Sequence, residues 1–393
     1  MPATNGSPPL PPRREPVLRA LADISGPDFA RTARSIDTVG GRRVSFVTVP
    51  ATARQVEDTL RIAAERGLAA RARGSGSKID WGTPPAGVDL LVDTGRLGGL
   101  WNHRPSELSA EVGTGTPVRA LQAALALRGQ RLAVDPPSRS ATVGGMLATN
   151  ESGPLRHKYG APAGQVAGVG YVDADGQRRE AELVGDDFDG VLLSAALRLE
   201  PLPAARRWVS VPVSTPLQVH NLVDEALAQQ VDPSAVEVDL PTPAPGGRTT
   251  AQPPGAVSVL LEGGAQSVVE RAGRLARSLG PGAEVAEIAP TWWGRYPFGV
   301  KDVALRISVR IEDLHAAVYA LRDAAGGAVP IRGSAGVGTV HAVLPGDLEP
   351  QRVEGIVDSV RSVLMARSGR AVIIGAPPAI AREVDMAGRR ELF

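Results

Sequence analysis

Cysteine does not occur among the 393 residues of this chain. Its absence excludes disulfides, thiol catalysis, cysteine-ligated zinc and iron–sulfur clusters on this chain. We expect no metal site on this chain. A redox enzyme built on this sequence would have to hold its electrons in a bound organic cofactor.

The sequence also lacks an excess of charge of one sign and long hydrophobic runs. Lys and Arg total 43 against 42 Asp and Glu, so no overall field would attract nucleic acid or an anionic membrane. No apolar run approaches the roughly 18 residues typical of a membrane-spanning helix, and the N-terminus has no hydrophobic segment for export. We expect a cytoplasmic protein with no transmembrane segment and no nucleic-acid partner.

Glycine is abundant, and one glycine-rich segment follows a predicted helix over 55–67 and a short predicted strand over 68–72. This segment reads Arg73-Gly-Ser-Gly-Ser-Lys78. A strand that ends in such a loop can turn several backbone N–H groups toward one concavity, which suits a pyrophosphate. The spacing fits neither Gly-x-x-x-x-Gly-Lys-Ser/Thr nor Gly-x-Gly-x-x-Gly, so this loop alone does not identify a ligand.

A second glycine-rich segment runs from Asp135-Pro136-Pro137 to Thr142-Val143-Gly144-Gly145 and on to Asn150. Two adjacent glycines permit a close approach to the main chain and a positive φ. We interpret this segment as a loop, rather than a helix or strand, that binds a flat ligand with polar edges. The alternative is a glycine-rich turn between two elements of the fold.

Together the two segments resemble FAD-linked oxidases of the vanillyl-alcohol-oxidase type, which share the PCMH-type FAD-binding domain. The segment 73–82 is similar to that domain's pyrophosphate loop, and 135–160 is similar to its second flavin loop. Within the family, the chain most resembles the FAD-binding E subunit of glycolate oxidase, from about residue 44 to residue 388. The Trp-Trp pair at 292 and the segment 376–385 add to this resemblance.

The resemblance implies the cofactor and the residues that contact it. The family binds FAD, and Ser75 and Ser77 stand where relatives with covalent FAD carry histidine, so we expect non-covalent FAD. For Tyr159, ordinary packing at a turn is an equal alternative. The residues expected to bind the cofactor are Arg73, Gly74, Ser75, Gly76, Ser77, Lys78, Trp81, Pro136, Thr142, Val143, Gly144, Gly145, Thr149, Asn150, Gly153, Tyr159 and Gly160.

The order of predicted helices and strands fits an α+β protein with two large domains. Residues 1–40 would form an N-terminal tail with a short helix, and 41–203 the PCMH-type FAD-binding domain of two α+β subdomains. From 204 to 375, strand, helix and strand repeat, which suggests a ferredoxin-like cap with helices on one face of an antiparallel sheet. Residues 376–393 would form a C-terminal tail. In the resembled family such a cap closes over the flavin and determines substrate specificity.

Two residues of the cap are candidates for catalysis. Arg306 lies in a predicted strand where the family often has arginine, and its guanidinium would hold the carboxylate of a small 2-hydroxy acid in two hydrogen bonds. His341 follows Gly336-Val-Gly-Thr-Val340, which is similar to a Gly-Asp-Gly-Asn-Leu-His stretch of related oxidoreductases. The alternatives are an outward-facing strand arginine and a structural histidine, the latter because Val337 and Thr339 replace polar residues.

Two departures from the family bear on catalysis. A flavin-contacting segment of the resembled subunits is shortened here, near 183–190, and the sequence ends before the tail that usually returns to the active site. We therefore expect a more open flavin site. A second flavoprotein and iron–sulfur subunits, with which the resembled subunit works, would be its partners.

The sequence thus predicts an FAD-dependent oxidoreductase that oxidises a small 2-hydroxy acid by hydride transfer to FAD. The first alternative is a non-catalytic or assembly subunit of an FAD-linked oxidase complex that has lost part of the flavin site. The second is a nucleotide-binding or regulatory module that uses the same loops without redox chemistry.

Overall fold

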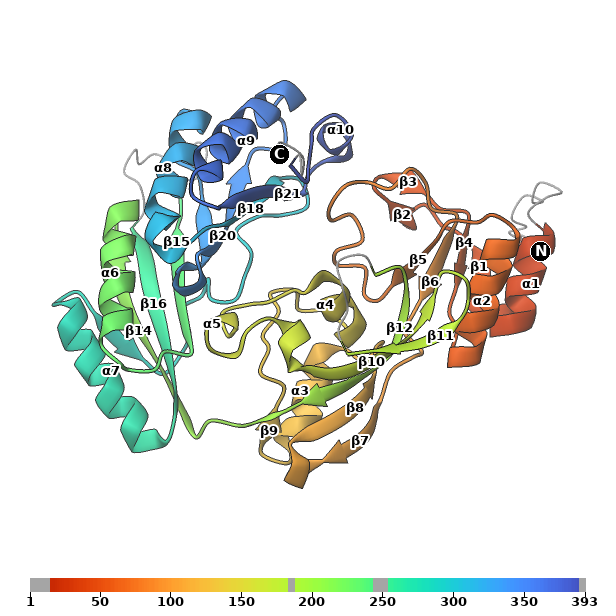
Figure 1. The fold of residues 1–393 in the computed structure, drawn as a ribbon, viewed down its shortest axis with the longest axis horizontal. Coiled ribbons are helices and arrows are strands. Elements are labelled where there is room, and N and C mark those ends of the chain that lie inside the picture. The colour runs from red at the N-terminus through yellow and green to blue at the C-terminus, as the bar shows by residue number, and fades with distance from the viewer. Residues whose placement is uncertain (1–14, 183–187, 243–253, 389–393) are drawn as a thin grey trace, which may run out of the picture.

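The computed structural model describes residues 15–182, 188–242 and 254–388, and its chain folds around three main sheets (Figure 1). The shortened segment expected near 183–190 lies mostly outside these residues, as do the first 14 residues of the N-terminal tail and the last five residues of the C-terminal tail. Short 3-10 turns at Pro27–Phe29, Pro105–Glu107, Pro162–Gln165, Ile311–Asp313 and Ala335–Val337 connect several of the elements.

The first sheet has four strands in the order β1-β4-β6-β5, and β6 pairs in parallel with both β4 and β5. Helices α1 and α2 pack against each other beside it, on the right of Figure 1. The Thr52 side chain caps α2 by accepting from the Gln55 backbone N–H, which satisfies one of the free donors of the first turn. The elements are α1 (Glu15–Ser25), β1 (Ala30–Thr32), β4 (Phe46–Thr48), α2 (Ala53–Glu65), β5 (Ala70–Arg73) and β6 (Leu90–Asp93), with a small hairpin of β2 (Thr38–Val39) and β3 (Arg42–Arg43).

The second sheet is antiparallel, with the strand order β11-β10-β12-β8-β7. Its apolar face packs on α3 and α4 through a core that includes Val112, Leu121, Met146 and Leu197. The elements are β7 (Leu100–Arg104), β8 (Ser109–Gly113), α3 (Val118–Ala126), β9 (Gln130–Arg131), α4 (Val143–Thr149), α5 (Arg156–Tyr159), β10 (Val166–Asp173), β11 (Arg178–Ala181), β12 (Gly190–Arg198) and β13 (Glu200–Pro201).

The third sheet has eight strands in the order β17-β14-β16-β15-β19-β20-β18-β21. Its two halves repeat one chain order, β-α-β-β-α-β, which is the ferredoxin-like motif, and β15 and β19 join them edge to edge. The cap is therefore a pair of ferredoxin-like units that share one sheet. The elements are β14 (Ala205–Val213), α6 (Pro216–Ala228), β15 (Ala235–Leu240), β16 (Gly255–Gly263), α7 (Ala265–Leu279), β17 (Glu284–Ala286), β18 (Val303–Ser308), α8 (Leu314–Ala325), β19 (Ile331–Ser334), β20 (Thr339–Leu344), α9 (Pro350–Met365), β21 (Arg370–Gly375) and α10 (Pro378–Ala381).

Helices α6 to α9 cover the outer face of this sheet, and its opposite face looks toward the first two sheets (Figure 1). In α7, Val268, Ala272, Leu275 and Leu279 are buried at helical spacing, so one stripe of the helix packs on the valine-rich sheet. The uncovered face carries polar side chains, such as Arg306 and His341, and apolar ones, such as Trp208 and Ile374, toward the rest of the molecule. The α+β fold class and the helices on one face of an antiparallel cap sheet are confirmed.

Candidate functional site

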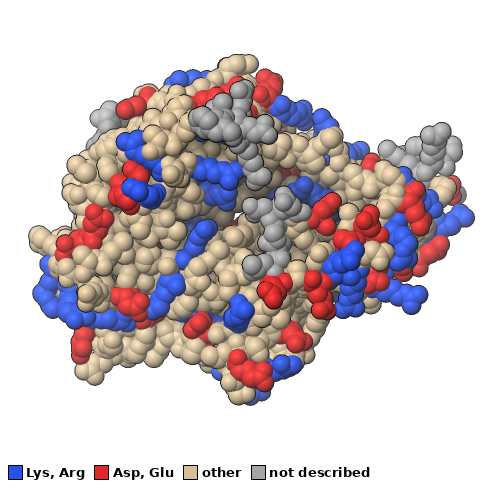
Figure 2. Space-filling view, in the orientation of Figure 1, with Lys and Arg blue, Asp and Glu red and all other residues tan. Residues whose placement is uncertain are grey.

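A cavity of about 1010 Å³ lies between the first two sheets and the cap. The segment 73–79 forms one side and residues from 141 to 150 form another, while Arg306, Ser308, Thr339 and Arg370 reach it from the cap. Figure 2 shows the surface hollowed between the two halves of the molecule, with Lys and Arg side chains around the hollow. The two glycine-rich segments and the cap thus meet at one site, as the resemblance implied.

The first glycine-rich segment turns sharply after β5. Gly76 has a φ of +76°, a conformation that residues other than glycine rarely adopt. Within the part of the chain that the structure describes, the backbone N–H groups of Ser75, Gly76, Ser77 and Lys78 donate no hydrogen bond. Free N–H groups that border a cavity suit an anion such as a pyrophosphate, so this segment fits the central part of FAD.

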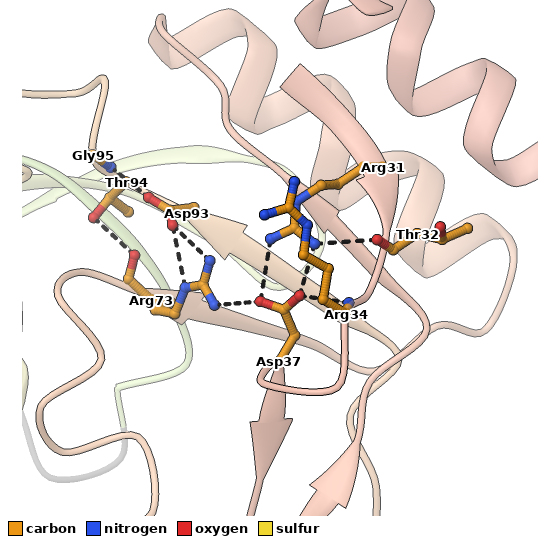
Figure 3. Close-up of polar contacts among 8 residues, drawn as sticks. All are labelled: Arg31, Thr32, Arg34, Asp37, Arg73, Asp93, Thr94 and Gly95. Carbon is orange, nitrogen blue, oxygen red and sulfur yellow. Dashed lines mark hydrogen bonds and ion pairs between the residues drawn. The ribbon is translucent and has the colours of Figure 1, made fainter. Parts of the chain in front are cut away.

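The Arg73 guanidinium is held by two carboxylates at the base of this loop (Figure 3). Its Nη1 donates to Asp37 at 2.9 Å, and its Nη2 donates to Asp93 at 2.8 Å. Asp37 also accepts from Arg31 at 2.7 Å, and the hydrogen bond from Arg31 contributes most to holding the pKa of Asp37 far below its usual value. Arg73 borders the cavity but has its charge balanced by acids, so it positions the loop.

Lys78 is also engaged within the protein. Its ammonium pairs with the carboxylate of Glu151 and donates to the Ser138 hydroxyl at 3.0 Å. Glu151 in turn accepts from the Ser138 backbone N–H and from the Tyr296 hydroxyl, both at 3.0 Å. Burial lowers the pKa of Lys78 in spite of Glu151, and burial raises the pKa of Tyr296. This network ties both glycine-rich segments to the cap.

The second glycine-rich segment contains a helix, so the expectation of a loop without helix or strand is wrong. Val143 to Thr149 form α4, and the Thr142 side chain caps it by accepting from the Gly145 N–H at 3.2 Å. The two segments pack closely, because a Cβ on Gly74 would lie 2.3 Å from the Thr142 Oγ1. Gly74 thus allows the first segment to lie against the start of α4.

The diglycine has two different environments. A Cβ on Gly144 would meet the Cβ of Thr114 at 2.9 Å, and Gly144 does not line the cavity, so packing inside the protein accounts for this glycine. Gly145 does line the cavity, as do Thr142, Thr149 and Asn150.

The other residues that the resemblance assigned to the cofactor lie in several places. Trp81 and Gly153 border a smaller cavity next to the large one, and Pro136 borders a separate groove. Val143 is fully buried in the core. The Tyr159 hydroxyl accepts from Arg131 at 2.9 Å, and neither Tyr159 nor Gly160 is among the described residues that line the large cavity.

The smaller cavity has a volume of about 70 Å³, and both predicted catalytic residues, Arg306 and His341, line it. Arg306 on β18 stands directly opposite His341 on β20, and His341 stands opposite Arg332 on β19. Directly opposed residues share one face of a sheet, so these three side chains form a row on the face turned toward the FAD-binding segments. Arg306 borders both cavities, and Arg332 is paired with Asp239 at 2.8 Å.

His341 is electrically neutral in this environment. Burial lowers its pKa to about 3, and the positive charge of Arg306 adds to the effect. Its ring contacts Tyr296 edge-on, with 5.0 Å between ring centroids. A neutral imidazole at a cavity can accept a proton, whereas its protonated form cannot.

Sequence reasoning missed several polar residues of the smaller cavity, among them Glu151, Tyr296 and Glu237. The first two meet only through the fold, since Tyr296 is 145 positions from Glu151. Glu237 is a buried carboxyl whose pKa burial raises to about 8, so it stays protonated at neutral pH. No pattern in the sequence singled it out.

No group of three or more metal-binding side chains occurs within 15–182, 188–242 and 254–388. No helix in the same ranges is long and apolar enough to cross a membrane.

Residues 44–182 match the FAD binding domain family. Among curated proteins, an uncharacterized FAD-linked oxidoreductase of Mycobacterium tuberculosis is 26% identical over 212 residues, covering 50% of this chain and 46% of that protein. The D-lactate dehydrogenase of Archaeoglobus fulgidus is 27% identical, covering 49% and 47%. Glycolate oxidase subunit GlcE of Escherichia coli is 29% identical, covering 41% and 49%. The chain spans about half the length of the curated relatives it matches.

Solved structures show the same fold over a larger part of the chain. An alkyldihydroxyacetonephosphate synthase superposes with a TM-score of 0.69 at 15% identity, covering 93% of this chain and 81% of that chain. A substrate-bound p-cresol methylhydroxylase gives 0.68 at 12% identity, covering 94% and 90%. Residues 44–182 are therefore similar to the FAD binding domain family, and the chain shares the fold of p-cresol methylhydroxylase.

Proposed function

We propose that this protein oxidises a small 2-hydroxy acid to the corresponding 2-oxo acid, using non-covalently bound FAD. The observation that carries the proposal is the cross-strand pair of Arg306 and His341, which faces a small cavity beside the large one. An arginine and a neutral histidine provide the two functions that a 2-hydroxy acid needs, a partner for its carboxylate and an acceptor for its hydroxyl proton.

The large cavity suits FAD by its residues as well as by its volume. The free backbone N–H groups of 75–78 would hold the pyrophosphate, and Gly145 leaves room for close approach at α4. Neither segment places a histidine at this cavity, in keeping with non-covalent binding. When bound, FAD supplies a two-electron acceptor for the hydride from the substrate carbon.

The smaller cavity limits the substrate to a small molecule. Its volume of about 70 Å³ corresponds to roughly five water-sized groups. Glycolate and lactate are of this size, whereas a long or aromatic 2-hydroxy acid is not. Arg306 would hold the carboxylate by two hydrogen bonds and orient the substrate carbon toward the large cavity, which this arginine also borders.

His341 would take the hydroxyl proton while the substrate carbon loses its hydride. The alcohol O–H and C–H bonds break, the C=O bond of the 2-oxo acid forms, and the proton remains on the imidazole. Binding of the carboxylate offsets the charge of Arg306, one of the causes of the low pKa of His341. The substrate would thus make its own base stronger.

The names of two relatives agree with this substrate class, because D-lactate and glycolate are both small 2-hydroxy acids. The test is reduction of the bound flavin, followed by its absorbance without oxygen, upon addition of glycolate, D-lactate or L-lactate. We expect bleaching by at least one of them, and a loss of at least 100-fold in the rate in Arg306→Gln protein that still holds FAD. Protein that purifies with FAD but is bleached by none of these acids would contradict the proposal.

A second candidate is a subunit that holds FAD for a complex and does not itself turn over. The complete lack of cysteine favours an electron acceptor outside this chain, because no cysteine-ligated cluster can form on it. We propose a second flavoprotein or an iron–sulfur subunit as that acceptor. Steady turnover by the isolated, monomeric protein with an acceptor dye would rule out a subunit that does not itself turn over, and turnover with oxygen alone would rule out the need for a partner.

A further inference from the structure

A third cavity, of about 740 Å³, lies between α3 and the segment 131–139 on one side and the cap on the other. It shares no lining residue with the large cavity beside the glycine-rich segments. Arg119, Ala123 and Arg139 on its border are exposed, so solvent reaches it directly. Its volume lies within the range of sites that bind small organic molecules.

The walls of this interdomain groove are mostly apolar. Leu132 and Leu155 come from the FAD-binding part, and Trp208, Leu260 and Trp293 come from the cap. The two tryptophan rings meet edge-on, with 6.1 Å between their centroids. An apolar surface of this kind favours a ligand with a hydrocarbon body.

The arginines inside the groove are paired with an acid, but those at its border are not. Glu262 binds the buried Arg131 at 2.7 Å and Arg206 at 2.9 Å, which neutralises much of the positive charge of the interior. Arg119 and Arg139 have no ion pair or hydrogen bond to any residue within the described ranges. Two unpaired guanidiniums at the edge of an apolar groove favour an anionic head group.

The groove also contains buried donors that lack a partner. The Trp208 Nε1 and the Arg131 Nε are both buried and have no hydrogen-bond partner among the described residues. Both side chains are more than nine-tenths buried and belong to the groove lining. Buried donors without a partner are uncommon in proteins, and a bound water is an ordinary explanation, which leaves the apolar wall of the groove for another ligand.

We propose that this groove binds a single-chain amphiphilic carboxylate of the fatty-acid type. Its carboxylate would pair with Arg119 and Arg139, and its hydrocarbon chain would lie against Leu132, Leu155 and Trp208. A neutral hydrocarbon would leave the two guanidiniums unused, and a small inorganic anion would leave the apolar wall exposed.

Binding can be followed by the fluorescence of the tryptophans that line the groove, with decanoate, dodecanoate and tetradecanoate as probes below their micelle-forming concentrations. We expect the dissociation constant to fall about three- to fourfold for each added CH₂ group, as apolar burial predicts. 1-Dodecanol should bind at least tenfold more weakly than dodecanoate. The proposal would be overturned if the acids showed no saturable binding or if their affinity did not depend on chain length. It would also be overturned if 1-dodecanol bound as tightly as dodecanoate.

Variants test the two halves of the site separately. Replacing both Arg119 and Arg139 by glutamine should weaken dodecanoate binding at least tenfold, whereas Arg66→Gln, at an exposed position on another part of the surface, should not. Ala123→Glu places a carboxylate on the exposed rim and should also weaken binding. Unchanged affinity in the Arg119 and Arg139 variant would overturn the proposal. So would binding to anionic lipid vesicles without binding to the monomeric acids.

Discussion

The ammonium of Lys78 is paired with the carboxylate of Glu151, so the first glycine-rich segment is joined to the residues that follow α4. Both side chains are almost fully buried, at 6% and 1% exposed. A lysine in a phosphate-binding loop commonly contacts the phosphate, but Lys78 forms an ion pair within the protein. The backbone N–H groups of the loop are left for the anion.

Removing one partner of this pair should destabilise the protein strongly. We expect Lys78→Met to lower the free energy of unfolding by about 3–5 kcal/mol, because Glu151 would remain buried without its partner. The double variant Lys78→Met, Glu151→Gln should recover most of the loss. Chemical denaturation measures both values, and Arg104→Gln, in an exposed pair with Glu107, should cost less than about 1 kcal/mol. A loss for Lys78→Met as small as for Arg104→Gln would show that the pair contributes little.

Gly76 should be essential for holding FAD. Gly76→Asp brings a negative charge into the concavity of N–H groups and a side chain into a left-handed conformation, at φ +76°. We expect the purified protein to lose its flavin absorbance while its far-UV circular dichroism remains. Gly164→Ala serves as the control, because a Cβ there meets nothing within 4 Å. Flavin retained at the parent's level in Gly76→Asp would show that the pyrophosphate does not lie here.

The fit between Gly74 and Thr142 should also be measurable. A Cβ at residue 74 would lie 2.3 Å from the Thr142 Oγ1, so Gly74→Ala should force the two segments apart. We expect weaker FAD binding and about 1–3 kcal/mol lower stability from overpacking. Thr142→Ala added to Gly74→Ala should relieve the clash and restore part of the affinity, although it removes the cap of α4. If the double variant recovered no affinity for FAD, a contact other than the one with Thr142 would account for the effect of Gly74→Ala.

The pH profile should reveal the state of His341. In the free enzyme a base must be deprotonated, and kcat/KM reports the pKa values of the free enzyme. With the pKa of His341 near 3, kcat/KM should not fall between pH 8 and pH 5 on account of this residue. An ordinary histidine would titrate near pH 6.5. His341→Gln should lower kcat by at least 100-fold, and a fall of parent activity centred near pH 6.5 would contradict the assignment.

Glu237 should make the protein less stable as the pH rises. Its pKa is about 8 when folded and about 4.5 when unfolded. Between these values the folded state keeps a proton that the unfolded state releases, so stability falls with increasing pH. Glu237→Gln should remove up to about 1.4 kcal/mol per pH unit of that decline. Denaturation at pH 5, 6, 7 and 8 measures the slope, and Glu65→Gln, at an exposed position, should not change it.

Much of the fold could be predicted from the sequence, because apolar and polar residues alternate in the cap strands and the cap helices have an apolar stripe. The repeat of strand, helix and strand expected from 204 to 375 is present twice, from β14 to β17 and from β18 to β21. Helix α4 was missed, since it is short and contains two glycines. It forms because Thr142 caps it and because Val143, Met146 and Leu147 are buried against the second sheet.

Parts of the candidate site that consist of neighbouring residues in the sequence could be predicted. Parts that depend on contacts between residues far apart in the sequence could not. The concavity of the Gly74–Lys78 segment was predicted from its glycine-rich composition and its place directly after a strand, although its spacing matches neither phosphate-binding motif. The roles of Arg73 and Lys78 depend on Asp37, Asp93 and Glu151, which the fold brings from other elements. Cross-strand pairing placed Arg306 beside His341, and only the sheet register reveals that pairing.

The pair of Arg131 and Glu262 has a consequence for protein engineering. Arg131 belongs to the FAD-binding part and Glu262 to the cap, and two hydrogen bonds of 2.7 and 2.8 Å join them away from solvent. A chimera that takes its cap from a relative would separate these residues and leave a guanidinium buried without its acid. Exchange of the cap should therefore succeed only when positions 131 and 262 are transferred as a unit.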